Sequence, residues 1–142
     1  ELSRRALAAA SDELDPAARR RAHKVIEQID EFRRQSRLAW ERKAASELKV
    51  RLNQWQAYLQ DLAERPGESE RYSQEVRARA MATYLLEEAA HQPQAGETRK
   101  TLEALDARLR ASFEAGRFIW DPSLEPAYRA EDYWFLFGRP KG

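Results

Sequence analysis

The stretch that decides the fold runs from residue 15 to residue 65 and reads DPAARRRAHKVIEQIDEFRRQSRLAWERKAASELKVRLNQWQAYLQDLAER. Between Pro16 and Pro66 it contains no proline and no glycine, and most of its residues are strong helix formers. Asp15 followed by Pro16 predicts a helix start, because a carboxylate accepts hydrogen bonds from first-turn amides and proline suits the first helical position. Pro66-Gly67 predicts its end. We therefore expect one helix of about 50 residues, about 75 Å long.

Apolar residues recur along this helix at spacings of three and four, which is typical of an amphipathic helix with one buried stripe. The stripe comprises Ala22, Val25, Ile26, Ile29, Phe32, Trp40, Leu48, Leu52, Trp55, Leu59 and Leu62. Its centre moves by roughly a quarter turn between the two halves, at about 100° per residue. Either the helix winds around one partner, or its two halves face different partners.

Two shorter helices are expected over residues 69–91 and 98–115, separated by the breaker segment 93–96. Short connections favour antiparallel neighbours, as in an up-down bundle. Gly116 is well placed to cap the third helix, and a short N-terminal helix is expected within residues 1–14. The second helix is expected to bury Tyr72, Val76, Ala80, Met81, Tyr84 and Leu85.

The C-terminal tail, residues 117–142, is rich in aromatic residues and prolines. We expect residues 118–120 to be extended, one turn of helix after Asp121-Pro122, and a short helix over 130–137. Two roles are open for the tail: it straps across the bundle and completes the core, which we favour, or it projects an anchor for a partner protein. The candidate residues are Trp120, Tyr128, Tyr133, Trp134, Phe135 and Phe137.

The expected fold is all-α: a single helical domain forming an elongated antiparallel bundle on the ~50-residue helix, with two shorter helices and an ordered aromatic-rich tail. The 142 residues suffice for one core, and the hydrophobic fraction of 42% fits a globular chain. No run approaches the ~18 apolar residues of a membrane span, and no signal-peptide pattern is present. We expect a soluble, cytoplasmic protein. The absence of cysteine excludes disulfides and thiolate sites.

Helix lengths predict how the long helix is covered. The two shorter helices, each reaching roughly 30 Å, can line only residues 43–64. At about 1.5–3 kcal/mol for each large side chain, the apolar face of the first half should not stay exposed. We expect a second copy to cover it through an isologous, coiled-coil-like interface, giving a homodimer; the alternative is a helix bent or broken near Ser36–Lys43 in a compact monomeric four-helix bundle. The expected self-association residues are Val25, Ile26, Ile29, Phe32 and Trp40.

Nucleic-acid binding is the runner-up function. Residues 17–43 carry nine basic and four acidic side chains, a net charge of +5 (9 − 4). A basic helix can follow a phosphate backbone. However, the acids are interspersed at helical spacing, which favours a salt-bridged solvent face, and the whole chain has a net charge of only +1. The candidate phosphate contacts are Arg19, Arg20, Arg33, Arg34 and Arg37.

Motifs for enzymatic chemistry are missing from the sequence: there is no nucleophile elbow and no phosphate-cradling glycine loop. Glu88 with His91, and His23 with Glu27, are half-sites for a metal that lack the further carboxylates a bundle site needs. We expect no enzyme, no metal and no other cofactor. A third possibility is a small-molecule pocket lined by Trp40, Trp55, Tyr84 and Trp120. The favoured function is a non-enzymatic interaction or scaffold protein, associating with itself and with another protein.

Overall fold

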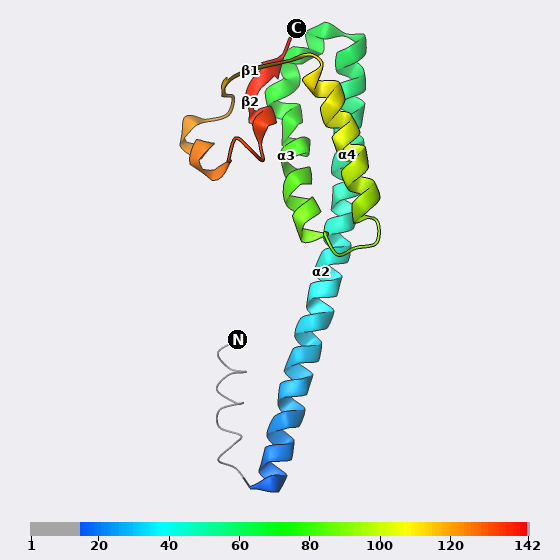
Figure 1. Ribbon diagram of the computed structural model, residues 1–142, viewed down its shortest axis with the longest axis vertical. Helices are drawn as coiled ribbons and strands as arrows, with labels where there is room; N and C mark the ends of the chain where they lie inside the picture. The colour runs from blue at the N-terminus through cyan, green and yellow to red at the C-terminus, as the bar shows by residue number, and fades with distance from the viewer. Residues whose placement is uncertain (1–14, 142) are drawn as a thin grey trace. The chain divides into compact units, whose positions relative to one another are not determined.

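The computed structural model of the chain describes residues 15–141, and it confirms a fold dominated by α-helices (Figure 1). The elements are, in order, α2 (Pro16–Glu64), the 3₁₀ helix η1 (Pro66–Arg71), α3 (Tyr72–Glu88), α4 (Ala95–Arg110), β1 (Phe113–Phe118), the 3₁₀ helices η2 (Pro122–Ala127) and η3 (Trp134–Leu136), and β2 (Phe137–Pro140). The chain divides into two compact units, residues 1–40 (the N-terminal unit) and residues 41–142 (the C-terminal unit). The short helix expected within residues 1–14 lies outside the described residues.

The bounds of α2 agree with the signals in the sequence. The Asp15 carboxylate accepts a hydrogen bond from the Ala18 amide at 2.7 Å, so it caps the first turn. The helix ends at Glu64, directly before the Arg65-Pro66 bond, where the proline ring restricts the preceding residue. Its secondary structure is continuous through residues 36–43, so the alternative of a helix broken there is wrong.

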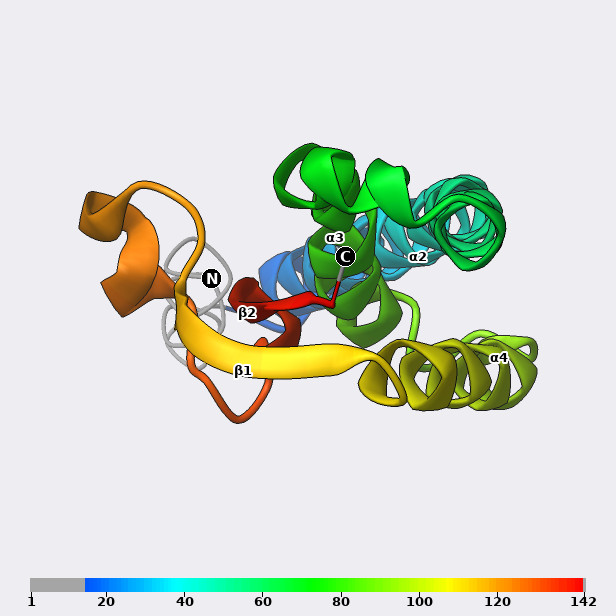
Figure 2. The same ribbon diagram turned by 90° about the horizontal axis from the view of Figure 1, so that it is seen from above.

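The C-terminal unit is built from the second half of α2, α3 and α4, which lie side by side as antiparallel neighbours (Figures 1 and 2). Their apolar faces meet in one core cluster, to which α4 contributes residues at spacings of three and four. The tail also enters this core. The largest fully buried side chains are Trp55, Tyr72, Val76, Leu109, Phe135 and Leu136.

The expected bounds of the two shorter helices were wrong in part. The second element begins as η1 and is α-helical only over Tyr72–Glu88, rather than 69–91. Two of its expected core residues are exposed, Met81 by 39% and Tyr84 by 45%. Met81 follows the buried Tyr72 by nine positions, which at about 100° each places it on the opposite face of the helix.

The third helix spans Ala95–Arg110, not 98–115, because the chain enters a strand at Phe113. Gly116 therefore lies within β1 and does not cap a helix. The short helix expected over 130–137 was also wrong: only Trp134–Leu136 forms a single 3₁₀ turn before β2 begins. Helical propensity in these segments gives way to strand pairing with a distant part of the chain.

The sheet has two antiparallel strands, with Phe113 opposite Pro140 and Glu114 opposite Arg139. The pairing continues beyond the start of β1 and the end of β2, since the Lys141 amide donates to the Ser112 carbonyl at 2.7 Å. Gly138 has a φ of +142°, and a Cβ added there would lie 2.3 Å from the Glu114 carbonyl oxygen. Only glycine can occupy this position without moving the backbone.

A buried ion pair joins α3 to α4, and its arginine also contacts the tail. Arg79 donates from Nε and Nη2 to the two carboxylate oxygens of Asp106, each at 2.8 Å. The two side chains are only 7% and 17% exposed. The same guanidinium lies over the Phe135 ring of η3, 4.4 Å from its centroid. One cation therefore joins three segments that are distant in sequence.

Substituting Asp106→Ala should lower the free energy of unfolding by about 3 kcal/mol, because it leaves the Arg79 charge buried without its partner. Urea denaturation measures this change. The control is Arg129→Gln, which breaks an ion pair with Glu131 whose side chains are 73% and 77% exposed, and it should leave stability unchanged. The double variant Arg79→Met, Asp106→Leu should recover most of the loss. A single variant as stable as the control would contradict this account of the pair.

A second prediction compares the two sheet glycines. Gly138→Ala should destabilise the protein by about 1–3 kcal/mol through backbone strain alone, and further through the clash with β1. Gly116→Ala should be close to neutral, since its Cβ would lie 3.8 Å from the Gly138 Cα, an ordinary contact. Thermal unfolding monitored by circular dichroism compares the two. Equal effects would show that the pairing of β1 with β2 is not as close as described.

Candidate interaction surfaces

The first half of α2 carries exposed apolar side chains along one face. The exposed fractions are 41% for Val25, 70% for Phe32 and 47% for Trp40, and Ile29 is half-buried. At about 100° per residue these four residues fall within a sector of about 80°. Ile26 is buried, so it does not belong to the exposed surface expected from the sequence. We call Val25, Ile29, Phe32 and Trp40 the α2 apolar face.

The arginines of the same half of α2 are only in part available for an external ligand. Arg34 forms a two-bond ion pair with Glu31, with its shorter contact at 2.7 Å. Hydrogen bonding to Arg34 lowers the pKa of the Glu31 carboxyl, and the pKa of Arg34 is raised in turn. Arg19 and Arg33 also take part in interactions within the chain. Arg20 and Arg37 are exposed. Three of the five candidate phosphate contacts therefore already interact within the chain, and Arg34 does so through an ion pair.

The aromatic tail packs against the helices of the C-terminal unit, as the strap interpretation requires. Phe135 is fully buried in the core cluster. Trp134 lies under the Arg110 guanidinium, 3.9 Å from its ring centroid, and meets Phe113 edge-on. The indole of Trp120 donates to the Ser73 carbonyl at 2.8 Å. The remaining candidates, which are half-buried among other aromatic rings, are Tyr128, Tyr133 and Phe137.

Two buried tyrosines of the C-terminal unit add hydrogen bonds to this packing. The Tyr72 hydroxyl donates to the Phe135 carbonyl, which ties α3 to η3. The Tyr58 hydroxyl donates to the Glu68 carbonyl at 2.9 Å, which ties α2 to η1. Burial, reinforced by the charge of Glu75, raises the pKa of Tyr58 to about 12. Burial likewise raises the pKa of Tyr72 well above its usual range.

The residues proposed for a small-molecule pocket do not come together. Trp55 is fully buried in the core, whereas Tyr84 is exposed on α3. Trp120 is engaged with Ser73, and Trp40 belongs to the separate N-terminal unit. Within the C-terminal unit, Trp55, Tyr84 and Trp120 therefore do not line a common pocket.

Among residues 15–141, no group of three or more His, Cys, Asp or Glu side chains is arranged to hold a metal ion. The helices of the same range include none that is long and apolar enough to cross a membrane.

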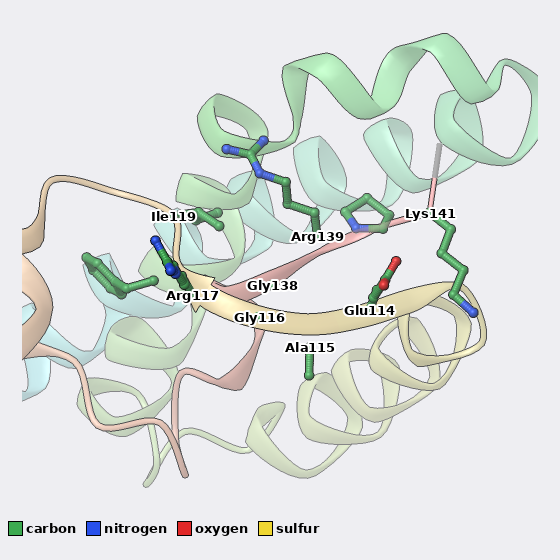
Figure 3. Close-up of a pocket in the computed structure, with 10 residues that line it drawn as sticks. Glu114, Ala115, Gly116, Arg117, Ile119, Gly138, Arg139 and Lys141 are labelled. Carbon is green, nitrogen blue, oxygen red and sulfur yellow. The ribbon is translucent and has the colours of Figure 1, made fainter.

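Two cavities of the C-terminal unit were not predicted from the sequence. One, of about 540 Å³, lies between α2 and α4 over Leu48 and Leu52. The other, of about 570 Å³, lies on the two-stranded sheet and is drawn in Figure 3. Its lining includes Gly116-Arg117 from β1 and Gly138-Arg139 from β2. The repeated Gly-Arg dipeptide is the sequence feature that its two strands share, although the dipeptide alone does not indicate that these strands pair.

Comparison of the chain with protein-family models, with curated proteins and with solved structures finds no match. The protein is therefore described by its own fold and surfaces. It is mainly α-helical with a two-stranded sheet, and it has an apolar helix face in one unit and a basic cavity in the other.

The raised tyrosine pKa values predict that stability falls in alkaline solution. Above pH 10 tyrosines ionise in the unfolded chain, whereas Tyr58 stays protonated in the folded chain until about pH 12. The unfolded chain then binds fewer protons, so the free energy of unfolding decreases as the pH rises through this window. In the variant Tyr58→Phe this decrease should be shallower. Denaturant titrations between pH 9 and about pH 12 measure both slopes, and equal slopes would contradict the assignment.

Proposed function

We propose that this protein is a non-enzymatic interaction protein of the cytoplasm that associates with itself through the α2 apolar face. The observation that carries the proposal is the 70% exposure of Phe32, flanked on the same face by Val25 and Trp40. Removing such side chains from water contributes about 1.5–3 kcal/mol each. An exposed row of large apolar residues on a helix is typical of a surface that packs against another helix.

The spacing of this face favours a partner helix. Val25, Ile29, Phe32 and Ser36 follow one another at intervals of four, three and four residues, and Trp40 lies four residues further on. Alternating intervals of four and three match the seam of two helices packed at a small angle. A second copy of the chain supplies an identical face, so a two-fold axis suffices to bury both.

Charge gives this interface a characteristic salt dependence. Residues 17–43 carry a net charge of +5 (9 − 4), so two copies repel each other across the seam. Added salt screens this repulsion, and self-association should therefore strengthen with ionic strength. The competing function, nucleic-acid binding through exposed residues such as Arg20 and Arg37, has the opposite dependence, since counterion release makes that affinity fall steeply with salt.

The substitution Phe32→Glu tests the interface. It should raise the dissociation constant of the dimer on the order of 30-fold or more, because it places a charge at the centre of the apolar seam. The control is His23→Glu, nine positions away and hence on the opposite side of α2, which adds the same charge outside the seam. Analytical ultracentrifugation of both variants and the unsubstituted chain, at low and high salt, gives the constants.

Three results would overturn the proposal. The first is an unsubstituted chain that stays monomeric at high micromolar concentration, and the second is equal weakening by both substitutions. The third is an association that weakens with salt and requires nucleic acid, which would favour the competing function instead. Circular dichroism of Phe32→Glu shows whether the helix itself is retained.

A further inference from the structure

The cavity on the two-stranded sheet is lined by two glycines at its floor, by a rim of charged side chains, and by the apolar residues Phe118, Ile119 and Pro140. Figure 3 shows Glu114, Arg117 and Arg139 rising from the sheet around Gly116 and Gly138, whereas Ala115 points the other way. Lys141 completes the lining beyond the end of β2. Three cations and one carboxylate therefore surround a space of about 570 Å³.

The three cations of this rim have no ionic partner within residues 15–141. Arg139 lies opposite Glu114 in the strand register, yet the two form no ion pair among the described contacts, and Arg117 and Lys141 form none either. Five other arginines of the C-terminal unit form ion pairs with carboxylates, namely Arg51, Arg65, Arg71, Arg79 and Arg129. Five more form none within residues 15–141, namely Arg42, Arg77, Arg99, Arg108 and Arg110, but these do not line the cavity together. The rim therefore concentrates positive charge that the chain does not use internally.

Gly116 keeps the floor open although the fold does not require glycine there. Its φ is not positive, and an added Cβ would meet only the Gly138 Cα at 3.8 Å. Gly138 differs, since its positive φ and close contact with β1 demand glycine. The missing side chain at position 116 therefore matters for the space above the sheet rather than for the pairing of the strands.

We propose that this cavity binds the phosphate group of a small phosphorylated molecule, with Arg117 and Arg139 as its main ligands and Lys141 as a supporting charge. Guanidinium groups match phosphate oxygens with paired hydrogen bonds. A volume of about 570 Å³ falls in the range of small-ligand sites. Glu114 is the only carboxylate in the lining, and it weakens the attraction for an anion.

The neighbouring loop favours a small ligand over a polyanion. Residues 121–132, which follow the cavity-lining segment 114–119, contain four acids and one base, a net charge of −3 (1 − 4). Such a loop repels an extended phosphate backbone, which needs a continuous basic track. A single phosphate or pyrophosphate group needs only the rim itself.

The experiment titrates the full chain with pyrophosphate by calorimetry and by amide NMR. We expect saturable binding with shifts at Gly116 and Gly138. Arg117→Gln and Arg139→Gln should each weaken it about tenfold, since each removes hydrogen bonds from a charged donor. Glu114→Gln should strengthen it about threefold by removing a like charge. Gly116→Leu should abolish it by filling the floor.

The matched control is Arg99→Gln on α4, which removes the same charge from an exposed position outside the cavity and should leave the affinity unchanged. The site does not rest on self-association, so Phe32→Glu should also bind pyrophosphate normally. Absence of saturable binding at millimolar pyrophosphate, or equal weakening by Arg99→Gln, would overturn the proposal. Citrate binding as tightly as pyrophosphate would overturn the phosphate assignment. Tighter binding of a short single-stranded oligonucleotide would overturn the small-ligand assignment.

Discussion

The buried pair of Arg79 with Asp106 is the interaction that links α3, α4 and the tail within the C-terminal unit. A charge removed from water is tolerated only with an opposite charge and satisfied hydrogen bonds, and the two contacts of 2.8 Å supply both. The Arg79 guanidinium also lies over the Phe135 ring, so the ion pair contributes to the position at which the tail contacts the helices. β2 begins two residues after Phe135, so the position of the sheet follows from the position of that ring.

Local signals explain why the long helix was predictable whereas the sheet was not. Asp15-Pro16 marks the start of α2 and Pro66 marks its end, and most residues between them are strong helix formers. Phe113–Phe118 has no comparable signal, since its strand is stabilised by residues 137–140, which lie 19 to 27 positions further on (137 − 118 and 140 − 113). Helix propensity depends only on residues close in sequence. The helix expected through residue 115 was therefore extended into a segment that pairs with β2.

The two candidate surfaces differ in the same way: one follows from local sequence and the other from the pairing of distant residues. The α2 apolar face could be predicted from the sequence, because helical periodicity alone places Val25, Phe32 and Trp40 together. Only the burial of Ile26 required coordinates. The sheet cavity could not be predicted, because it exists only when Glu114 lies opposite Arg139 and Gly138 has its positive φ. The two Gly-Arg dipeptides hint at it, but a dipeptide contains no information about which strands will meet.

The α2 apolar face and the sheet cavity depend on different parts of the chain. The α2 apolar face needs only a helix, so it persists for as long as residues 15–40 remain helical, whatever happens to the tail. The cavity needs the strand register, and β2 follows directly on η3, whose Phe135 is buried in the core against Arg79. A change that loosens the tail removes the basic rim and leaves the apolar face intact, and a change in residues 25–40 does the reverse. Self-association and anion binding can therefore be separated by mutation even though one chain carries both.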